Sequence, residues 1–198
     1  MTSLSQANAS LRKASPRPSV FFFVWFGQRY PVGKRIVIMG VAGCGKSTVG
    51  AAIAAAERLP LVEGDDFHSA ESRAKMAAGI PLTDADRAQW LVTLGLQLAA
   101  HPDGVVLTCS ALKKAYREQL RQAAPGLRFV FLAIDRASAL QRVASRGAHF
   151  FSASLVDSQF ATLESPVGEP LVLQADALEP LDRLQRRVGA WLQDKETA

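Results

Sequence analysis

Residues 40–47 read GVAGCGKS and match the pattern G-x-x-x-x-G-K-[ST], in which backbone amides and one lysine surround phosphate groups. The match lies between an apolar run at residues 36–39 and an alanine-rich run at 46–57, the strand–loop–helix context that the motif needs. We expect Lys46 to bridge the β- and γ-phosphates of ATP and Ser47 to bind Mg²⁺; a chance glycine turn is the alternative. The predicted nucleotide-binding residues are Gly40, Val41, Ala42, Gly43, Cys44, Gly45, Lys46, Ser47 and Thr48.

A cluster of acidic side chains, EGDDFH at residues 63–68, follows the second apolar run. Beyond the carboxyl end of a strand, carboxylates can hold Mg²⁺ through water or accept a hydroxyl proton. Because Glu63 and Asp65 alternate, we expect them on one face, with Glu63 in the water shell of Mg²⁺ and Asp65 at the substrate hydroxyl. The third strand ends at residues 108–110 without the acidic residue that many P-loop proteins carry there, which favours the acidic cluster as the metal site. The alternatives are a solvated acidic turn and, for His68, packing instead of substrate contact.

Basic residues gather in the segment 110–121, where Lys113, Arg117 and Arg121 recur every four residues along one stripe of a predicted helix. The helix starts at the carboxyl end of the third strand, beside the expected active site. We therefore expect Lys113 and Arg117 to bind substrate and count Arg117 among the catalytic residues, since an arginine can bind a carboxylate through two hydrogen bonds. The alternative is a solvated basic face.

A second pair of arginines, Arg142 and Arg146, is four residues apart and precedes the segment GAHFF at 147–151. A small kinase needs a lid that excludes water and places positive charge on the transferring phosphoryl group. We expect both arginines to act in this way from a lid at about residues 137–153, and one exposed helical face is the alternative.

Strands and helices must bring these residues together, and the sequence predicts their arrangement. Apolar runs at residues 36–39, 61–62, 105–108, 129–134 and 171–173 alternate with helical segments. Thr83 and Asp86 have capping-box spacing before the second of these helices. Strands that alternate with helices indicate the α/β class, with a parallel sheet covered on both faces.

The charge distribution argues against a nucleic-acid partner. The chain has a net charge of +5, and residues 1–34 alone contribute +5, because they contain five basic residues and no acidic ones. Residues 35–198 are therefore neutral overall, whereas a domain that binds nucleic acid is usually basic. We predict a disordered extension at 1–34, for which a leader peptide is the alternative, and a kinase domain at 35–198. No apolar run approaches the ~20 residues of a membrane span, and two cysteines suit a reducing compartment, so we expect a cytoplasmic protein.

Five segments together resemble the gluconokinase family of P-loop kinases, which is related to the shikimate kinases. They are MGVAGCGKST (39–48), EGDDFH (63–68), KMAAGIPLTDADRAQWL (75–91), CSALKKAYREQLR (109–121) and HFFSASLVDSQFATLE (149–164). The chain departs from the family pattern at residues 69–72, at Ala148 and at Ser152, which puts the fine substrate preference in doubt.

The resemblance implies a P-loop NTPase three-layer sandwich with a five-stranded parallel sheet in the order 2-3-1-4-5 and a helical lid. It implies the reaction of ATP with D-gluconate to give 6-phospho-D-gluconate and ADP, a homodimer, and a substrate-binding role for His149 in the lid segment. Two other readings remain: a kinase of this fold for another acceptor, such as shikimate or a nucleoside monophosphate, and a nucleotide-binding regulator without turnover.

Overall fold

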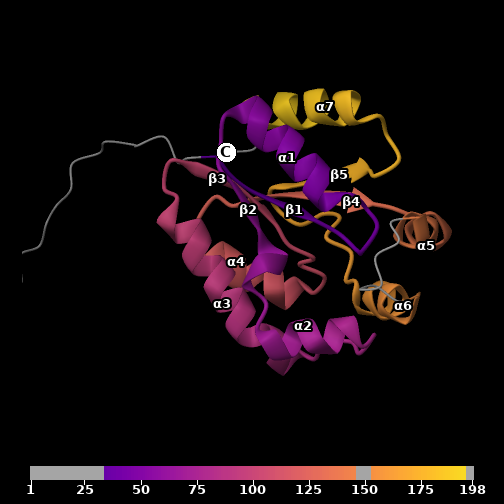
Figure 1. Ribbon diagram of the computed structural model, residues 1–198. Helices are drawn as coiled ribbons and strands as arrows, with labels where there is room; N and C mark the ends of the chain where they lie inside the picture. Colours follow the sequence, from indigo (N-terminus) through magenta and orange to yellow (C-terminus); the bar gives the residue numbers. More distant parts are fainter. Residues whose placement is uncertain (1–33, 146–152, 195–198) are drawn as a thin grey trace, which may run out of the picture. The chain divides into compact units, whose positions relative to one another are not determined.

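Five parallel strands form one sheet in the order β2-β3-β1-β4-β5, which confirms the predicted order (Figure 1). The computed structural model describes residues 34–145 and 153–194, which belong to one compact unit. The strands are β1 (Lys34–Met39), β2 (Leu61–Glu63), β3 (Gly104–Thr108), β4 (Arg128–Ala133) and β5 (Val172–Asp176).

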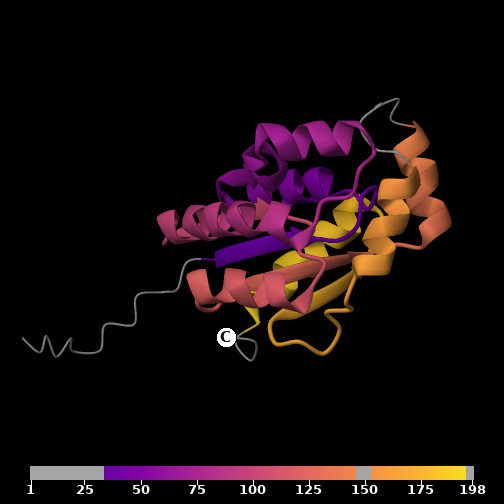
Figure 2. The ribbon, with the colours of Figure 1, turned by 90° about the horizontal axis from the view of Figure 1, so that it is seen from below.

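Helices cover both faces of this sheet, so the predicted three-layer α/β fold is confirmed. The helices are α1 (Lys46–Glu57), the 3-10 turn η1 (Gly64–Phe67), α2 (Ala70–Ala77), α3 (Asp84–Ala100), α4 (Lys114–Ala123), α5 (Arg136–Ser145), α6 (Ala153–Thr162) and α7 (Leu181–Gln193). Helices α1 and α7 lie together on one face, and α3 and α4 lie on the other (Figure 1). Figure 2 shows α5 and α6 side by side beyond one end of the strands.

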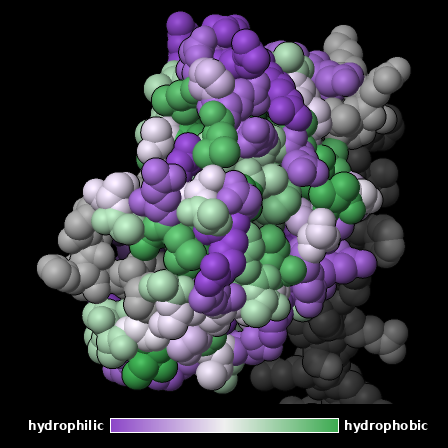
Figure 3. All heavy atoms as spheres, turned by 90° about the vertical axis from the view of Figure 1, so that its right-hand side faces the viewer, coloured by the Kyte–Doolittle hydropathy of each residue, from purple (hydrophilic) through white to green (hydrophobic). Residues whose placement is uncertain are grey.

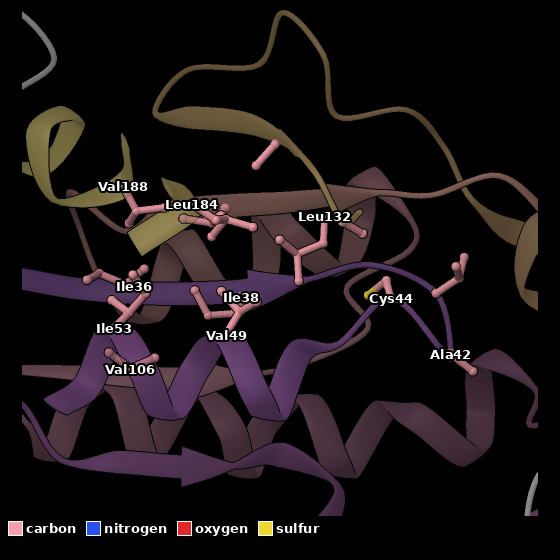
Figure 4. Close-up of a cluster of buried hydrophobic side chains, with 14 of the residues drawn as sticks. Ile36, Ile38, Ala42, Cys44, Val49, Ile53, Val106, Leu132, Leu184 and Val188 are labelled. Atoms are coloured by element: carbon pink, nitrogen blue, oxygen red, sulfur yellow. The ribbon is translucent and has the colours of Figure 1, made fainter. Parts of the chain in front are cut away.

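The side chains of the central strand β1 alternate between two hydrophobic cores, as a strand buried on both faces requires. Ile36 and Ile38 pack with α1 and α7 side chains, including Ile53 and Val188 (Figure 4). Val37 and its neighbours on the opposite face pack against the apolar stripes of α3 and α4. The phosphate-loop segment therefore leaves a strand that is anchored on both sides.

The structure changes some predicted boundaries. Strand β1 begins at Lys34, one residue before the expected start of the domain, because Lys34 pairs with Gly104 of β3 and its ammonium group contacts Glu57. Apart from Lys34, the predicted extension lies outside the described residues, as do residues 146–152 of the predicted lid. The described residues of the predicted lid belong to α5 and to the first residue of α6. The sequence analysis did not predict α6 as a helix of its own. No helix in the described part of the chain is long and apolar enough to span a bilayer.

Candidate active site

The phosphate loop runs from the end of β1 to the first turn of α1. Gly43 has a φ of +83°, and a Cβ atom there would lie 2.6 Å from the backbone oxygen of Ala139 in α5. Only glycine suits this position, because it tolerates both the left-handed backbone and the close approach. Lys46 Nζ donates to the carbonyl oxygens of Gly40 and Val41, each at 3.1 Å, so the lysine lies across the loop.

An oxygen cluster lies beside the start of α1. Ser47 Oγ donates to Glu63 Oε2 at 3.1 Å, and Thr108 Oγ1 donates to the same oxygen at 2.5 Å. Mg²⁺ in phosphate-transfer sites takes one or two protein oxygens and keeps several waters. The hydroxyl of Ser47 and the carboxylate behind it fit such an ion.

The segment after β2 is fixed from two sides. Trp90 Nε1 of α3 donates to the backbone oxygen of Gly64 at 2.7 Å, and Gly64 N donates to Thr108 Oγ1 at 3.3 Å. A Cβ atom on Gly64 would collide with the carbonyl oxygen of Thr108, so glycine lets the turn lie directly on β3. The turn that carries Asp65 is thereby held at the carboxyl edge of the sheet.

This turn corrects one expectation. Glu63 ends β2, but Asp65 lies in η1, so the two carboxylates do not share a strand face by alternation. Glu63 faces Ser47 and Thr108, whereas the side chain of Asp65 is 70% exposed and borders a pocket. The separation agrees with two different roles for the two carboxylates.

One pocket joins the phosphate loop to the acidic turn. It is lined by residues from the phosphate loop, the η1 turn, α2, α3, the loop after β3, α5 and α6, among them Ala42, Gly43, Lys46, Ser47, Asp65, His68, Arg87, Ser110, Ser158 and Gln159. Figure 3 looks onto the side of the molecule that carries α5 and α6, where hydrophilic and hydrophobic residues are intermixed. The pocket thus brings together seven predicted site residues: Ala42, Gly43, Gly45, Lys46, Ser47, Asp65 and His68.

His68 is a buried side chain with one unsatisfied nitrogen. Its ring stacks on Trp90 with centroids 4.3 Å apart, only 6% of the residue is exposed, and Nδ1 has no hydrogen-bond partner in the described part of the chain. Burial lowers the pKa of His68, and Arg87 and Arg73 lower it further, whereas Asp65, 3.9 Å from Nε2, opposes them. A neutral imidazole in the lining of the pocket can hydrogen-bond a ligand hydroxyl.

Replacing Trp90 with Phe should keep the ring but remove the hydrogen bond to Gly64. The orphaned carbonyl should lower the free energy of unfolding by about 1–3 kcal/mol. Because the turn carries Asp65, kcat should fall several-fold while KM for ATP changes little. Urea unfolding and steady-state kinetics measure both effects. Trp191→Phe, on α7, is the matched control, and a Trp90→Phe protein equal to it in kcat would show that this hydrogen bond does not position the turn.

Arg117 is not at the pocket, which corrects its predicted contact with substrate. It is fully buried, and its guanidinium donates to both carboxylate oxygens of Glu169 and to the carbonyl oxygens of Ala111 and Leu112. The reason is local packing: the Arg117 side chain turns inward under the loop that precedes α4. Arg117 therefore holds a loop next to the pocket, and Ser110 of that loop lines the pocket.

The other predicted basic residues have separate places. Lys113 pairs with Asp84 at 2.7 Å and is not among the residues that line the pocket. Arg142 Nη1 lies 3.5 Å from the backbone oxygen of Cys44 and borders a second hollow with Thr48 and Glu179. Arg146 and His149 lie outside the described residues.

Gln159 and Arg87 are among the pocket residues that received no role from the sequence. Gln159 Oε1 of α6 accepts a hydrogen bond from Ala42 N of the phosphate loop at 2.7 Å, a contact across 117 residues that spacing cannot reveal. Arg87 did leave a signal, because it precedes Leu91, Leu94 and Leu98 at four, seven and eleven residues and so continues the buried stripe of α3. A charged residue in an apolar stripe indicates a special environment.

A phosphate loop after the central strand β1, a lysine across it and an acidic turn at the end of β2 define a P-loop nucleotide-binding protein of the kinase type. The family model described as AAA domain matches residues 36–166 of the chain. The chain belongs, within this class, to the gluconokinase family, which confirms the resemblance seen in its motifs.

The similarity to known gluconokinases extends over most of the chain. It is 46% identical to a gluconokinase from Sinorhizobium meliloti 1021 of known crystal structure, with a TM-score of 0.76 over 81% of this chain and 92% of that chain. It is 43% identical over 144 residues to the gluconokinase of Gluconobacter oxydans (strain 621H), covering 70% of this chain and 80% of the relative. It is 39% identical over 137 residues to the thermosensitive gluconokinase of Escherichia coli (strain K12), covering 68% of this chain and 73% of the relative.

Proposed function

We propose that the protein transfers the γ-phosphoryl group of ATP to the terminal hydroxyl of D-gluconate, giving 6-phospho-D-gluconate and ADP. The observation that supports this most directly is that Lys46 and Asp65 line the same pocket. We infer that the acceptor is D-gluconate from the membership of the chain in the gluconokinase family.

In this reaction the hydroxyl oxygen of the acceptor forms a bond to the γ-phosphorus. The bond from that phosphorus to the β–γ bridging oxygen breaks, and ADP keeps the electron pair. Lys46 and the phosphate-loop amides bind the phosphate oxygens, and Asp65 orients the hydroxyl and takes its proton. Mg²⁺, held by Ser47 and through water by Glu63, would supply positive charge at the phosphates. His68, which lines the same pocket, would hold a second hydroxyl of the acceptor.

The second hollow fits the base of the nucleotide. It opens beside Gly45 and Thr48 of the phosphate-binding segment and is bordered by the guanidinium of Arg142. A planar guanidinium stacks well on an aromatic ring, so we assign Arg142 to the base rather than to the transferring phosphate. The roles expected for Arg146 and His149 in a closing lid stay predictions.

We place the reaction in the cytoplasm, where ATP is available and where two free, buried cysteines, Cys44 and Cys109, stay reduced. Burial raises the pKa of Cys109 to about 12, which keeps its thiol protonated and unreactive. A homodimer also remains a prediction, drawn from the family alone.

A coupled assay of ADP release tests the proposal. The purified protein is given ATP, Mg²⁺ and one acceptor at a time from a panel of sugar acids, shikimate and nucleoside monophosphates. We expect D-gluconate to give the highest kcat/KM. A higher value with shikimate or a nucleoside monophosphate would favour the kinase of another acceptor, and nucleotide binding without turnover on any of them would favour a regulator.

A further inference from the structure

Arg87 is a cation built into the wall of the pocket. It lies in the second turn of α3, is half-buried, and lines the pocket with Asp65 and His68. Its Nη1 donates to the carbonyl oxygen of Leu82, and its guanidinium carbon lies 6.0 Å from the centre of the Tyr116 ring. These contacts fix the side chain and leave guanidinium donors for a ligand.

The two acidic residues nearest to Arg87 on α3, Asp84 and Asp86, are engaged with other cations. Asp86 pairs with Lys75 at 2.6 Å, and Asp84 pairs with Lys113 at 2.7 Å. No ion pair of Arg87 occurs within residues 34–145 and 153–194. Arg87 therefore has no directly paired carboxylate in the described part of the chain, and its charge acts only at a distance, lowering the pKa of Asp84 and of His68.

The pocket thus has two cations from different parts of the fold. Lys46 belongs to the phosphate loop and is held there by two carbonyl oxygens. Arg87 comes from α3, which covers the opposite face of the sheet from α1. One cation serves the phosphates, and the other faces the acceptor side beside His68.

We propose that Arg87 binds the carboxylate of the acceptor and is the residue that makes the enzyme select a sugar acid over a neutral sugar. This proposal rests on the proposed function. A guanidinium matches a carboxylate with two parallel hydrogen bonds. A neutral acceptor would leave a half-buried charge without a partner, so it is bound less well. The role expected for Arg117 from its spacing belongs to Arg87.

The test compares D-gluconate with D-gluconamide, which replaces the carboxylate by a neutral amide and keeps the terminal hydroxyl. Both acceptors are assayed with the wild-type protein and with the Arg87→Met and Arg87→Lys variants. We expect Arg87→Met to lose about 10- to 100-fold in kcat/KM for gluconate, mainly through KM, with little change for gluconamide. Arg87→Lys should recover part of the loss, because it restores the charge without the planar fork.

Arg73→Met is the matched control, since Arg73 is exposed on α2 and contacts the backbone oxygen of Asp66 outside the pocket. It should leave the ratio of the two acceptors unchanged. KM for ATP and thermal unfolding of each variant show whether the phosphate loop and the fold are intact.

The outcomes separate the two proposals. If Arg87→Met leaves the ratio of kcat/KM for gluconate to kcat/KM for gluconamide unchanged, the role of Arg87 is overturned while the kinase assignment stands. If the wild-type protein phosphorylates neither gluconate nor gluconamide, the proposed function is refuted, and the role of Arg87 with it.

Discussion

Asp65→Asn is expected to lower kcat by about 10²–10⁴-fold, the usual contribution of a positioned general base. Asp65 lies in η1 with an exposed carboxylate at the pocket that it shares with Lys46. Asparagine keeps the shape and one hydrogen-bonding oxygen but cannot take the proton of the acceptor hydroxyl. The contacts to ATP come from the phosphate loop, so KM for ATP should change little.

Steady-state kinetics with each substrate varied in turn measure this effect. Asp66→Asn is the matched control, because Asp66 is the next residue of the same turn, is exposed and does not line the pocket. The rival assignment makes Glu63 the base and Asp65 part of the metal shell. It predicts that raised Mg²⁺ or Mn²⁺ restores Asp65→Asn, and that Glu63→Gln is the more damaging change; either result would refute our assignment.

Arg117→Met should destabilise the protein by about 3–5 kcal/mol, because it leaves the half-buried Glu169 carboxylate with Arg121 alone and two backbone carbonyl oxygens without a donor. Arg117 is completely buried, donates to Glu169 and holds the carbonyl oxygens of Ala111 and Leu112. The same loop is held on its other side by Glu164, whose carboxylate accepts from Lys114 N at 2.6 Å. Urea unfolding at neutral pH measures the loss. Arg186→Met breaks an exposed pair with Asp182 and should leave stability almost unchanged.

The ion pair also makes the stability depend on pH. Burial raises the pKa of Glu169, but the hydrogen bonds from Arg117 and Arg121 outweigh burial and hold the pKa below its ordinary value. The unfolded chain therefore takes up a proton at Glu169 at a higher pH than the folded protein does. This contribution to stability is complete above the ordinary glutamate range and is lost as the pH falls through the folded pKa. Glu169→Gln should remove this acid-dependent part, and an unchanged pH profile would contradict the assignment.

Much of the fold follows from local patterns in the chain. The phosphate loop, the capping box of Thr83 and Asp86 and the apolar stripe of α3 depend on residues within a few positions of each other, and the structure shows each of them. The strand order needed the family resemblance, since spacing along the chain does not determine which strands are neighbours.

The parts that spacing could not predict depend on distant partners. Arg117 had the spacing of an exposed stripe, but Glu169, 52 residues further on, accepts its hydrogen bonds and makes burial possible. Asp65 was placed on a strand face, but the hydrogen bond from Trp90 to Gly64 holds that segment in a 3-10 turn. Both errors concern the direction of a side chain, which is set by tertiary contacts rather than by sequence distance.

Because Trp90 stacks on His68, its fluorescence can report events in the pocket. The chain has three tryptophans, Trp25, Trp90 and Trp191, so replacing the first and last with phenylalanine leaves one indole, which touches a pocket residue. An acceptor that hydrogen-bonds His68 changes the surroundings of this indole directly. The emission of the single-tryptophan protein would then report acceptor binding without any phosphoryl transfer, and its titration would give a dissociation constant in the absence of ATP.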